Sequence, residues 1–205
     1  MLLVALAGAS LAAPATATAQ PATVDGERFH DPVPTITSLV CAGSDIVLTY
    51  SSAGTATGPY PGTYAERGRL VGSDLAAIFR IDSPAGRVVG VKTAGVGVTC
   101  LDAPPCDSAE ACADRNAVFA GTGRYVATIS GPDGAFGDRG AFGTTLFRCP
   151  GCVPPVPQLE RFESDFSSDL EQPTPTSGSV KDECKRGGWR RFGFRNQGQC
   201  VSFVV

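Results

Sequence analysis

The chain has 205 residues, a formal net charge of −3 and 42% hydrophobic residues, with 3 Lys against 14 Arg. This length accommodates one domain with an appendage. Nucleic-acid binding depends on an excess of positive charge, so the weakly acidic composition argues against a nucleic-acid partner.

Residues 1–19 have the features of a signal peptide. Met1 to Ala13 is almost wholly apolar, and Ala17-Thr18-Ala19 is a small-x-small cleavage pattern. The apolar run is shorter than the ~20 residues that a membrane span needs. We therefore predict cleavage before Gln20, no transmembrane segment and a secreted, extracellular protein.

All eight cysteines follow this segment, and an even number in an exported chain predicts disulfides. Roughly a hundred pairings are open to eight cysteines. The sequence favours only Cys184–Cys200. One set open to the other six is the local loop Cys106–Cys112, the turn Cys149–Cys152, and Cys41–Cys100. The C-x-x-C spacing of Cys149-Pro-Gly-Cys152 also occurs in redox sites, but no βαβ pattern surrounds it. A zinc site of Cys106, Cys112, Cys149 and Cys152 is the alternative that export disfavours, and we expect no metal or cofactor.

Residues 20–40 form a polar, proline-bearing N-terminal arm that becomes ordered near Ile36. The arm contains the chain's only histidine, His30. A catalytic base needs rigid support, so we interpret His30 as a solvated residue. No G-x-S-x-G motif is present to suggest a serine hydrolase.

Residues 41–152 are predicted to form an all-β body, because short alternating stretches are separated by turn residues. The expected strands are 45–50, 62–71, 75–81, 87–93, 96–101, 116–120, 124–130 and 141–148. The expected turns are Ser-Ser-Ala-Gly at 51–54, Ser-Pro-Ala-Gly at 83–86 and Gly-Pro-Asp-Gly at 131–134. This spacing is typical of a disulfide-bearing β-sandwich or a small barrel.

Residues 153–179 are interpreted as a proline-rich, acidic linker. Leu159, Phe162, Phe166 and Leu170 within it lie at helical spacing. The sequence leaves open whether they form a short amphipathic turn or whether the linker is a tether whose Phe residues touch the body.

Residues 180–205 form a basic cassette. They carry a net charge of +4, against −7 for residues 20–179, so the cassette either docks on the body or meets an anionic partner. Ser179 is a candidate cap for a short helix that runs through Lys185 and stops at Gly187-Gly188. We expect a hairpin of 189–194 and 199–205 with positive φ at Gly198, which a Cys184–Cys200 bridge would stabilise by about 3 kcal/mol.

The cassette resembles a C-terminal segment of secreted proteins from high-GC Gram-positive bacteria. The shared pattern is K-D-x-C-K-x-G-G-W-x-x-F-G-F-x-N-Q-G-x-C-V-x-F, which begins at Lys181 and ends at Phe203. No activity is assigned to that family, so the resemblance implies no cofactor and no catalytic residue.

Carboxylates of the body are the remaining candidates for catalysis, in an extracellular hydrolase. Those considered are Glu66, Asp74, Asp82, Asp133 and Asp138, which we place at strand ends and turns. Asp133 and Asp138 flank a Gly-rich turn that lacks the dense oxygen ligands of a calcium site, so a plain hairpin is favoured.

The strongest candidates for binding are Trp189, Arg190, Arg191 and Arg195. Arginine forks bind phosphate or carboxylate, and an indole stacks on a sugar. For these four residues the sequence gives somewhat more weight to a structural role, in which Trp189 and the cassette's Phe residues are buried while the arginines pair with acidic residues of the linker. The sequence favours a non-catalytic binding or envelope-associated protein whose cassette contacts an anionic cell-wall polymer or glycan, and the hydrolase is the alternative.

Overall fold

The computed structural model describes residues 22–32, 34–42, 45–95, 117–132, 134–148, 159–176 and 179–205. The predicted signal peptide, the predicted strand 96–101, Asp133, and Cys100, Cys106, Cys112, Cys149 and Cys152 lie outside these residues. Cys41 lies in a described strand, but its side chain is not described. The pairings proposed for these six cysteines and the zinc alternative therefore stay predictions.

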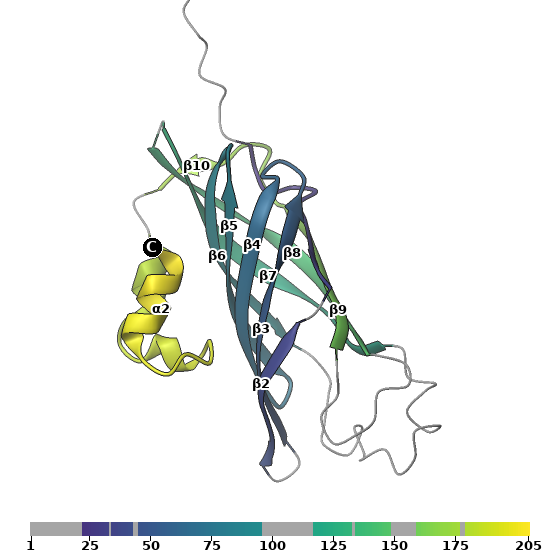
Figure 1. The fold of residues 1–205 in the computed structure, drawn as a ribbon. Coiled ribbons are helices and arrows are strands. Elements are labelled where there is room, and N and C mark those ends of the chain that lie inside the picture. Colours follow the sequence, from purple (N-terminus) through teal and green to yellow (C-terminus); the bar gives the residue numbers. More distant parts are fainter. Residues whose placement is uncertain are drawn as a thin grey trace, which may run out of the picture.

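One antiparallel sheet closes on itself as an eight-stranded barrel (Figure 1). Its strands are β1 (Arg28–Asp31), β3 (Asp45–Thr57), β4 (Gly62–Val71), β5 (Asp74–Ser83), β6 (Gly86–Gly95), β7 (Ala117–Gly131), β8 (Gly134–Arg148) and β9 (Leu159–Ser168). Neighbours pair in the order β1-β9-β8-β7-β6-β5-β4-β3, and the pairing of β1 with β3 closes the ring. The all-β prediction is confirmed as a barrel, and the β-sandwich is not found.

Two further strands extend the barrel wall. Strand β2 (Thr35–Ala42) pairs with β3 beyond the point where β1 leaves it, and β10 (Thr174–Pro175) pairs with β8. The turns at 83–86 and 131–134 are confirmed as hairpin turns, whereas residues 51–54 continue β3 without a break. Gly54 instead allows β1 to approach β3 where the barrel closes, because a Cβ at this position would overlap the carbonyl oxygen of His30 on β1.

Two segments outside the expected body supply barrel strands. The predicted arm 20–40 contains β1 and β2, and the predicted linker 153–179 contains β9 and β10. On β9, every second residue is buried in the barrel interior, as strand periodicity predicts: Phe162, Ser164 and Phe166. Phe166 also exchanges backbone hydrogen bonds with the N-terminal segment, where Gly26 N donates to Phe166 O at 2.9 Å.

The core follows from the two-residue period of the strands. On β4, Tyr64, Glu66, Gly68 and Leu70 are buried inside, and the alternate residues are more exposed outside. Aromatic rings fill the centre: Phe29 stacks on Tyr64 with ring centroids 4.0 Å apart and tilts against Phe166 at 4.7 Å. Strand β5 departs from the alternation, because Leu75–Phe79 is buried on both faces. Its outer face must therefore be covered.

The cassette supplies that cover with helical structure. It consists of η1 (Val180–Cys184), η2 (Gly188–Arg190) and α2 (Gln197–Val204), drawn yellow beside the barrel in Figure 1. The Ser179 cap is confirmed, since its Oγ accepts from Lys181 N at 3.2 Å. The Cys184–Cys200 disulfide is confirmed as well, with an S–S distance of 2.09 Å.

The predicted C-terminal hairpin is wrong. Asn196 Oδ1 accepts from Gln199 N at 2.9 Å, so Asn196 caps a helix where a strand was expected. Gly198 lies within α2, and the left-handed conformation is instead adopted at Gly187 (φ 86°) and Gly193 (φ 72°). The helix directs Cys200 and Val204 toward the barrel.

Candidate functional site at the junction of barrel and cassette

The cassette is docked on the barrel by apolar packing. Phe192 is fully buried and Phe194 nearly so, in a cluster with Ile78 of β5 and Val89 of β6. The cluster's other buried members are Ala76, Val180, Cys184, Cys200 and Val204. Burial of a Phe or Val side chain is worth about 1.5–3 kcal/mol, so apolar contact fixes the cassette's position on the barrel. The disulfide closes the cassette internally, between η1 and α2.

Arginines of the barrel wall hold the cassette through its backbone. Arg67 Nε on β4 donates to Gly193 O at 3.0 Å, and its guanidinium lies 5.0 Å from the Phe194 ring centroid. Arg80 on β5 donates to Phe203 O at 2.9 Å. Burial, and secondarily the charge of Arg195, lower the pKa of Arg67. Asp82 forms ion pairs with Arg80 and Arg87 at 2.7 Å, so the unpaired positive charge of this wall lies on Arg67 and Arg69.

The four residues predicted to bind are divided among three places. Trp189 is half-buried beside the cluster, and the Arg190 guanidinium lies 4.8 Å from its ring centroid. Arg195 is exposed near Arg67. Arg191 reaches the lining of a pocket. None of the three arginines forms an ion pair within the described part of the chain, so the expected pairing with acidic linker residues is not seen there.

This pocket, of about 680 Å³, opens where the cassette meets the barrel. Arg69, Arg124 and Arg191 contribute positive charge, whereas Asp74 is the one carboxylate of the lining. The remaining wall is formed by Val71, Leu75, Ala76, Thr93, Ala94, Gly95 and Gly123. The hollow therefore combines an apolar surface with an excess of guanidinium groups.

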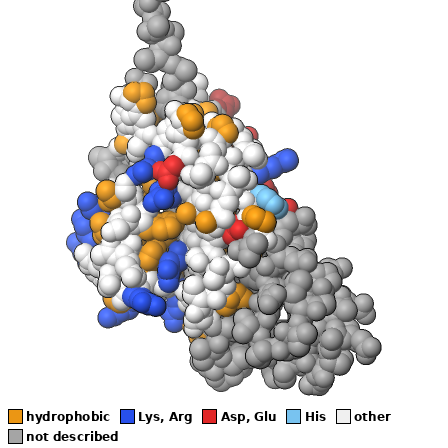
Figure 2. Space-filling model, in the orientation of Figure 1, with side chains coloured by type: hydrophobic (Ala, Val, Ile, Leu, Met, Phe, Trp, Pro, Cys, Tyr) orange, Lys and Arg blue, Asp and Glu red, His pale blue; other side chains and the backbone are white. Residues whose placement is uncertain are grey.

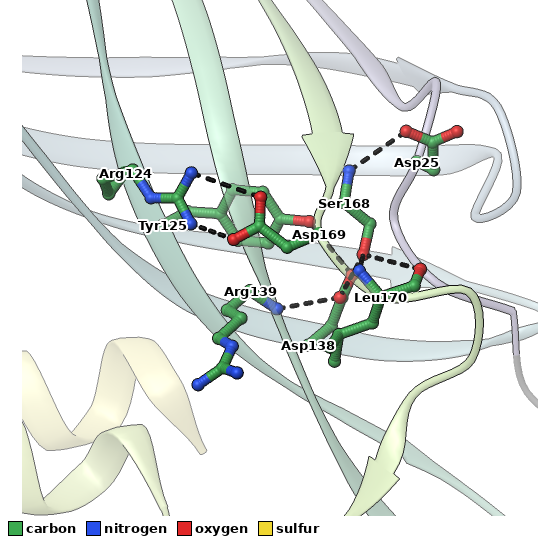
Figure 3. Close-up of polar contacts among 8 residues, drawn as sticks. All are labelled: Asp25, Arg124, Tyr125, Asp138, Arg139, Ser168, Asp169 and Leu170. Carbon is green, nitrogen blue, oxygen red and sulfur yellow. Dashed lines mark hydrogen bonds and ion pairs between the residues drawn. The ribbon is translucent and has the colours of Figure 1, made fainter.

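Only part of this positive charge is neutralised. Arg124 forms a two-pronged ion pair with Asp169, drawn in Figure 3. Within the described residues, Arg69 and Arg191 make no side-chain hydrogen bond or ion pair. Figure 2 shows blue side chains over the cassette and the adjoining barrel wall, with little red among them. This face is suited to an anion.

A second group of charges lies inside the barrel. Lys92 Nζ on β6 donates to Glu66 Oε2 at 2.6 Å and to Ser164 Oγ at 2.9 Å, and both members of the ion pair are 1% exposed. Tyr50 Oη donates to the other oxygen of Glu66 at 2.6 Å. Five Phe ring centroids lie 4.7–5.6 Å from the ammonium: Phe29, Phe79, Phe142, Phe162 and Phe166.

This interior pair is built as a structural element. Burial lowers the pKa of Lys92, and the Glu66 carboxylate opposes that shift. Each charged group has hydrogen-bond partners, and the aromatic faces stabilise the cation. With an exposed fraction of 1%, neither side chain reaches solvent or a polymer.

Two carboxylates placed at strand ends by the sequence lie inside strands instead. Glu66 is in the middle of β4, and Asp138 is buried in β8. Asp138 accepts from Tyr125 Oη at 3.0 Å and from Ser168 Oγ at 2.6 Å (Figure 3). It also accepts from Val24 N at 2.8 Å. Both carboxylates are therefore occupied by internal contacts.

The sequence carried weak indications of the residues that were missed. Lys92 is one of three lysines in an arginine-rich chain, and it directly follows the apolar stretch Val88–Val91. Arg67 and Arg69 stand two residues apart on β4, so strand periodicity directs both to the same face. What the sequence could not supply is the cassette's docking place, which brings Arg69 to Arg191.

Comparison with protein-family models, with curated proteins and with solved structures gave no match for this chain. Within the described residues, none of the helices has the length and apolar character to cross a membrane.

Proposed function

We propose that this protein is a secreted, non-catalytic binding protein whose docked cassette contacts an anionic polymer or glycan of the cell envelope. Export is supported by the signal-peptide pattern of residues 1–19 and by the even number of cysteines. The Cys184–Cys200 bridge is in keeping with an oxidising compartment.

The observation that carries the proposal is the place where the basic cassette docks. A segment with a net charge of +4 in an acidic protein would be neutralised by resting on carboxylates. It packs instead on a wall that bears Arg67 and Arg69, through apolar side chains. Like charges brought together on one face favour the approach of an anion, and they supply the guanidinium forks that bind phosphate or carboxylate.

Trp189 adds a second contact chemistry to this face. Its ring is half-buried and carries the Arg190 guanidinium at 4.8 Å. An arginine held over an indole is oriented for a phosphate, and the exposed part of the ring offers an apolar surface to a sugar. Anionic envelope polymers present both groups along one chain.

Substitution is a better test of this face than deletion of residues 180–205. Deletion would expose Ala76, Ile78 and Val89, which the cassette covers, so lost binding and lost folding would coincide. The double variant Arg190→Gln/Arg195→Gln removes two exposed charges and leaves the apolar cluster intact. The matched control Arg28→Gln/Arg139→Gln removes two exposed charges from β1 and β8.

The assay is retention of the oxidised protein on immobilised poly(glycerol phosphate), with a neutral glucan as the reference matrix, across a salt series. We expect retention on the anionic matrix to weaken several-fold for the cassette variant, by roughly the worth of two exposed charge contacts, and to remain unchanged for the control. Retention should also fall as salt rises. Equal retention of both variants would refute a role for the cassette.

A further inference from the structure

We propose that the pocket lined by Arg69 and Arg191 is a binding site for a phosphomonoester group carried on a small organic body. The inference rests on the proposed function and adds a specific site to it: the exposed cassette face contacts the polymer, and the pocket takes a terminal phosphate. It differs from the polymer contact in the residues that it uses and in the ligand that it selects.

The charge of the pocket favours a doubly negative group. Arg69 lies on β4, and Arg191 caps the C-terminal end of η2. The barrel and the cassette therefore each supply one guanidinium. Neither side chain is engaged by another described residue. Two uncommitted guanidinium groups match the two charges of a phosphomonoester better than the single charge of a carboxylate.

The third arginine of the lining is already paired. Arg124 is held by Asp169, which raises the pKa of Arg124 and fixes its orientation. Because this ion pair carries no net charge, Arg69 and Arg191 supply the positive charge that a bound phosphate would meet.

The apolar part of the lining sets the size and character of the attached body. Val71 and Ala76 lie on the outer face of the wall and offer apolar side chains to the hollow, whereas the side chains of Leu75 and Ala94 belong to the barrel interior. Thr93 and Asp74 offer hydrogen-bonding groups beside them. A volume of about 680 Å³ lies within the ~300–1,000 Å³ of ordinary small-molecule sites. It suits one ring or one short chain attached to the phosphate, so the site fits the end of a polymer or a free phosphate ester.

The test titrates the oxidised protein with phenyl phosphate, inorganic phosphate, phenylacetate and benzyl alcohol at fixed ionic strength. Trp189 is the chain's only tryptophan and stands two residues from Arg191, so its fluorescence reports binding, and calorimetry gives the stoichiometry. We expect one site, with phenyl phosphate tighter than either inorganic phosphate or phenylacetate and with no binding of benzyl alcohol. Tighter binding of phenylacetate than of phenyl phosphate would overturn the assignment of the phosphate, and equal binding of inorganic and phenyl phosphate would overturn the role of the apolar wall.

The decisive variant is Arg69→Gln/Arg191→Gln, compared with Arg28→Gln/Arg139→Gln as the matched control. Losing two charge-assisted contacts should weaken phenyl phosphate binding about tenfold or more, whereas the control should bind within about twofold of wild type. Unchanged thermal unfolding of both variants excludes misfolding, because neither pair contributes to the apolar cluster. Equal affinities for the two variants would refute the pocket.

The two proposals fail in different assays. If the pocket is absent, phenyl phosphate does not bind, while polymer retention still depends on Arg190 and Arg195. If the polymer proposal is wrong, retention is insensitive to those arginines, while phenyl phosphate still binds in a manner that depends on Arg69 and Arg191.

Discussion

The ion pair inside the barrel gives the sharpest prediction about stability. The substitution Lys92→Met keeps a long, unbranched side chain among the Phe rings and removes the ammonium. It leaves the Glu66 carboxylate 1% exposed with Tyr50 Oη as its remaining donor in the described structure. Removing one partner of a buried ion pair destabilises a protein by about 3–5 kcal/mol, because the other charge stays buried.

The double variant Lys92→Met/Glu66→Gln separates the buried charge from the lost contact. The amide that replaces the Glu66 carboxylate would still accept the hydrogen bond of Tyr50 and carries no charge. We expect this variant to be destabilised by about 1–3 kcal/mol, as for an imperfectly satisfied polar group, and therefore to be more stable than Lys92→Met alone. A non-additive result of this kind is the signature of a coupled pair.

The measurement is reversible urea unfolding of the oxidised protein, followed by Trp189 fluorescence and far-ultraviolet circular dichroism. A domain of this size is stable by about 5–15 kcal/mol in total, so the loss expected for Lys92→Met is a large part of it. A Lys92→Met protein within about 1 kcal/mol of wild type would show that the pair is not the structural element described above. Equal instability of the single and double variants would refute the coupling.

Three further predictions concern the cassette and the N-terminal segment. Cys184→Ser/Cys200→Ser should lower the free energy of unfolding by about 3 kcal/mol. It should also weaken phenyl phosphate binding, because Arg191 is then less well fixed. Unchanged binding would contradict a pocket that the barrel and the cassette form together. Gly193→Ala should destabilise by about 1–3 kcal/mol in urea unfolding, since φ is 72° and the new Cβ would overlap Thr49 Cγ2; Gly131→Ala, with nothing within 4 Å, is the control. Burial raises the pKa of Glu27 above 4.5, and the hydrogen bond from Tyr60 N partly opposes this shift. The folded state therefore binds a proton more tightly than the unfolded state does. As the pH rises from 4.5 through the pKa of Glu27 in the folded state, the free energy of unfolding should fall. Thermal unfolding measured across this pH range should show a decrease of stability with pH in wild type and a smaller decrease in Glu27→Gln. An equal pH dependence in the two proteins would contradict the prediction.

The sequence was most informative where local chemistry decides the structure. Strand β4 has the predicted bounds of 62–71, and the turns at 83–86 and 131–134 lie where proline and glycine placed them. The Ser179 cap and the Cys184–Cys200 bridge were likewise predictable from short-range spacing. These features depend on a few neighbouring residues and not on the tertiary arrangement.

Features set by distant pairing were not predictable in this way. The four-residue spacing of Phe162 and Phe166 fits a helix face and also one face of a strand, and only pairing with β1 and β8 decides for the strand. The ion pair of Lys92 and Glu66 joins β6 to β4 across the interior, so it depends on the register of the intervening strand β5. Sequence reasoning selected Arg191 for the candidate site but could not select Arg69, because their proximity depends on where the cassette docks.

The unequal charge of cassette and body has a different consequence once the docking place is known. Two outcomes were expected for a segment of net charge +4: neutralisation on an acidic body or contact with an anionic partner. The cassette does dock on the body, but it contacts arginines there. Arg67 donates to a backbone carbonyl of the cassette, and Arg69 lines the pocket. Burial, and in part the charge of Arg195, lower the pKa of Arg67. The cassette is therefore held against electrostatic repulsion by the packing of Phe192 and Phe194 and by the hydrogen bonds of Arg67 and Arg80 to its backbone. A bound anion would relieve that repulsion, so ligand binding and docking of the cassette should stabilise each other.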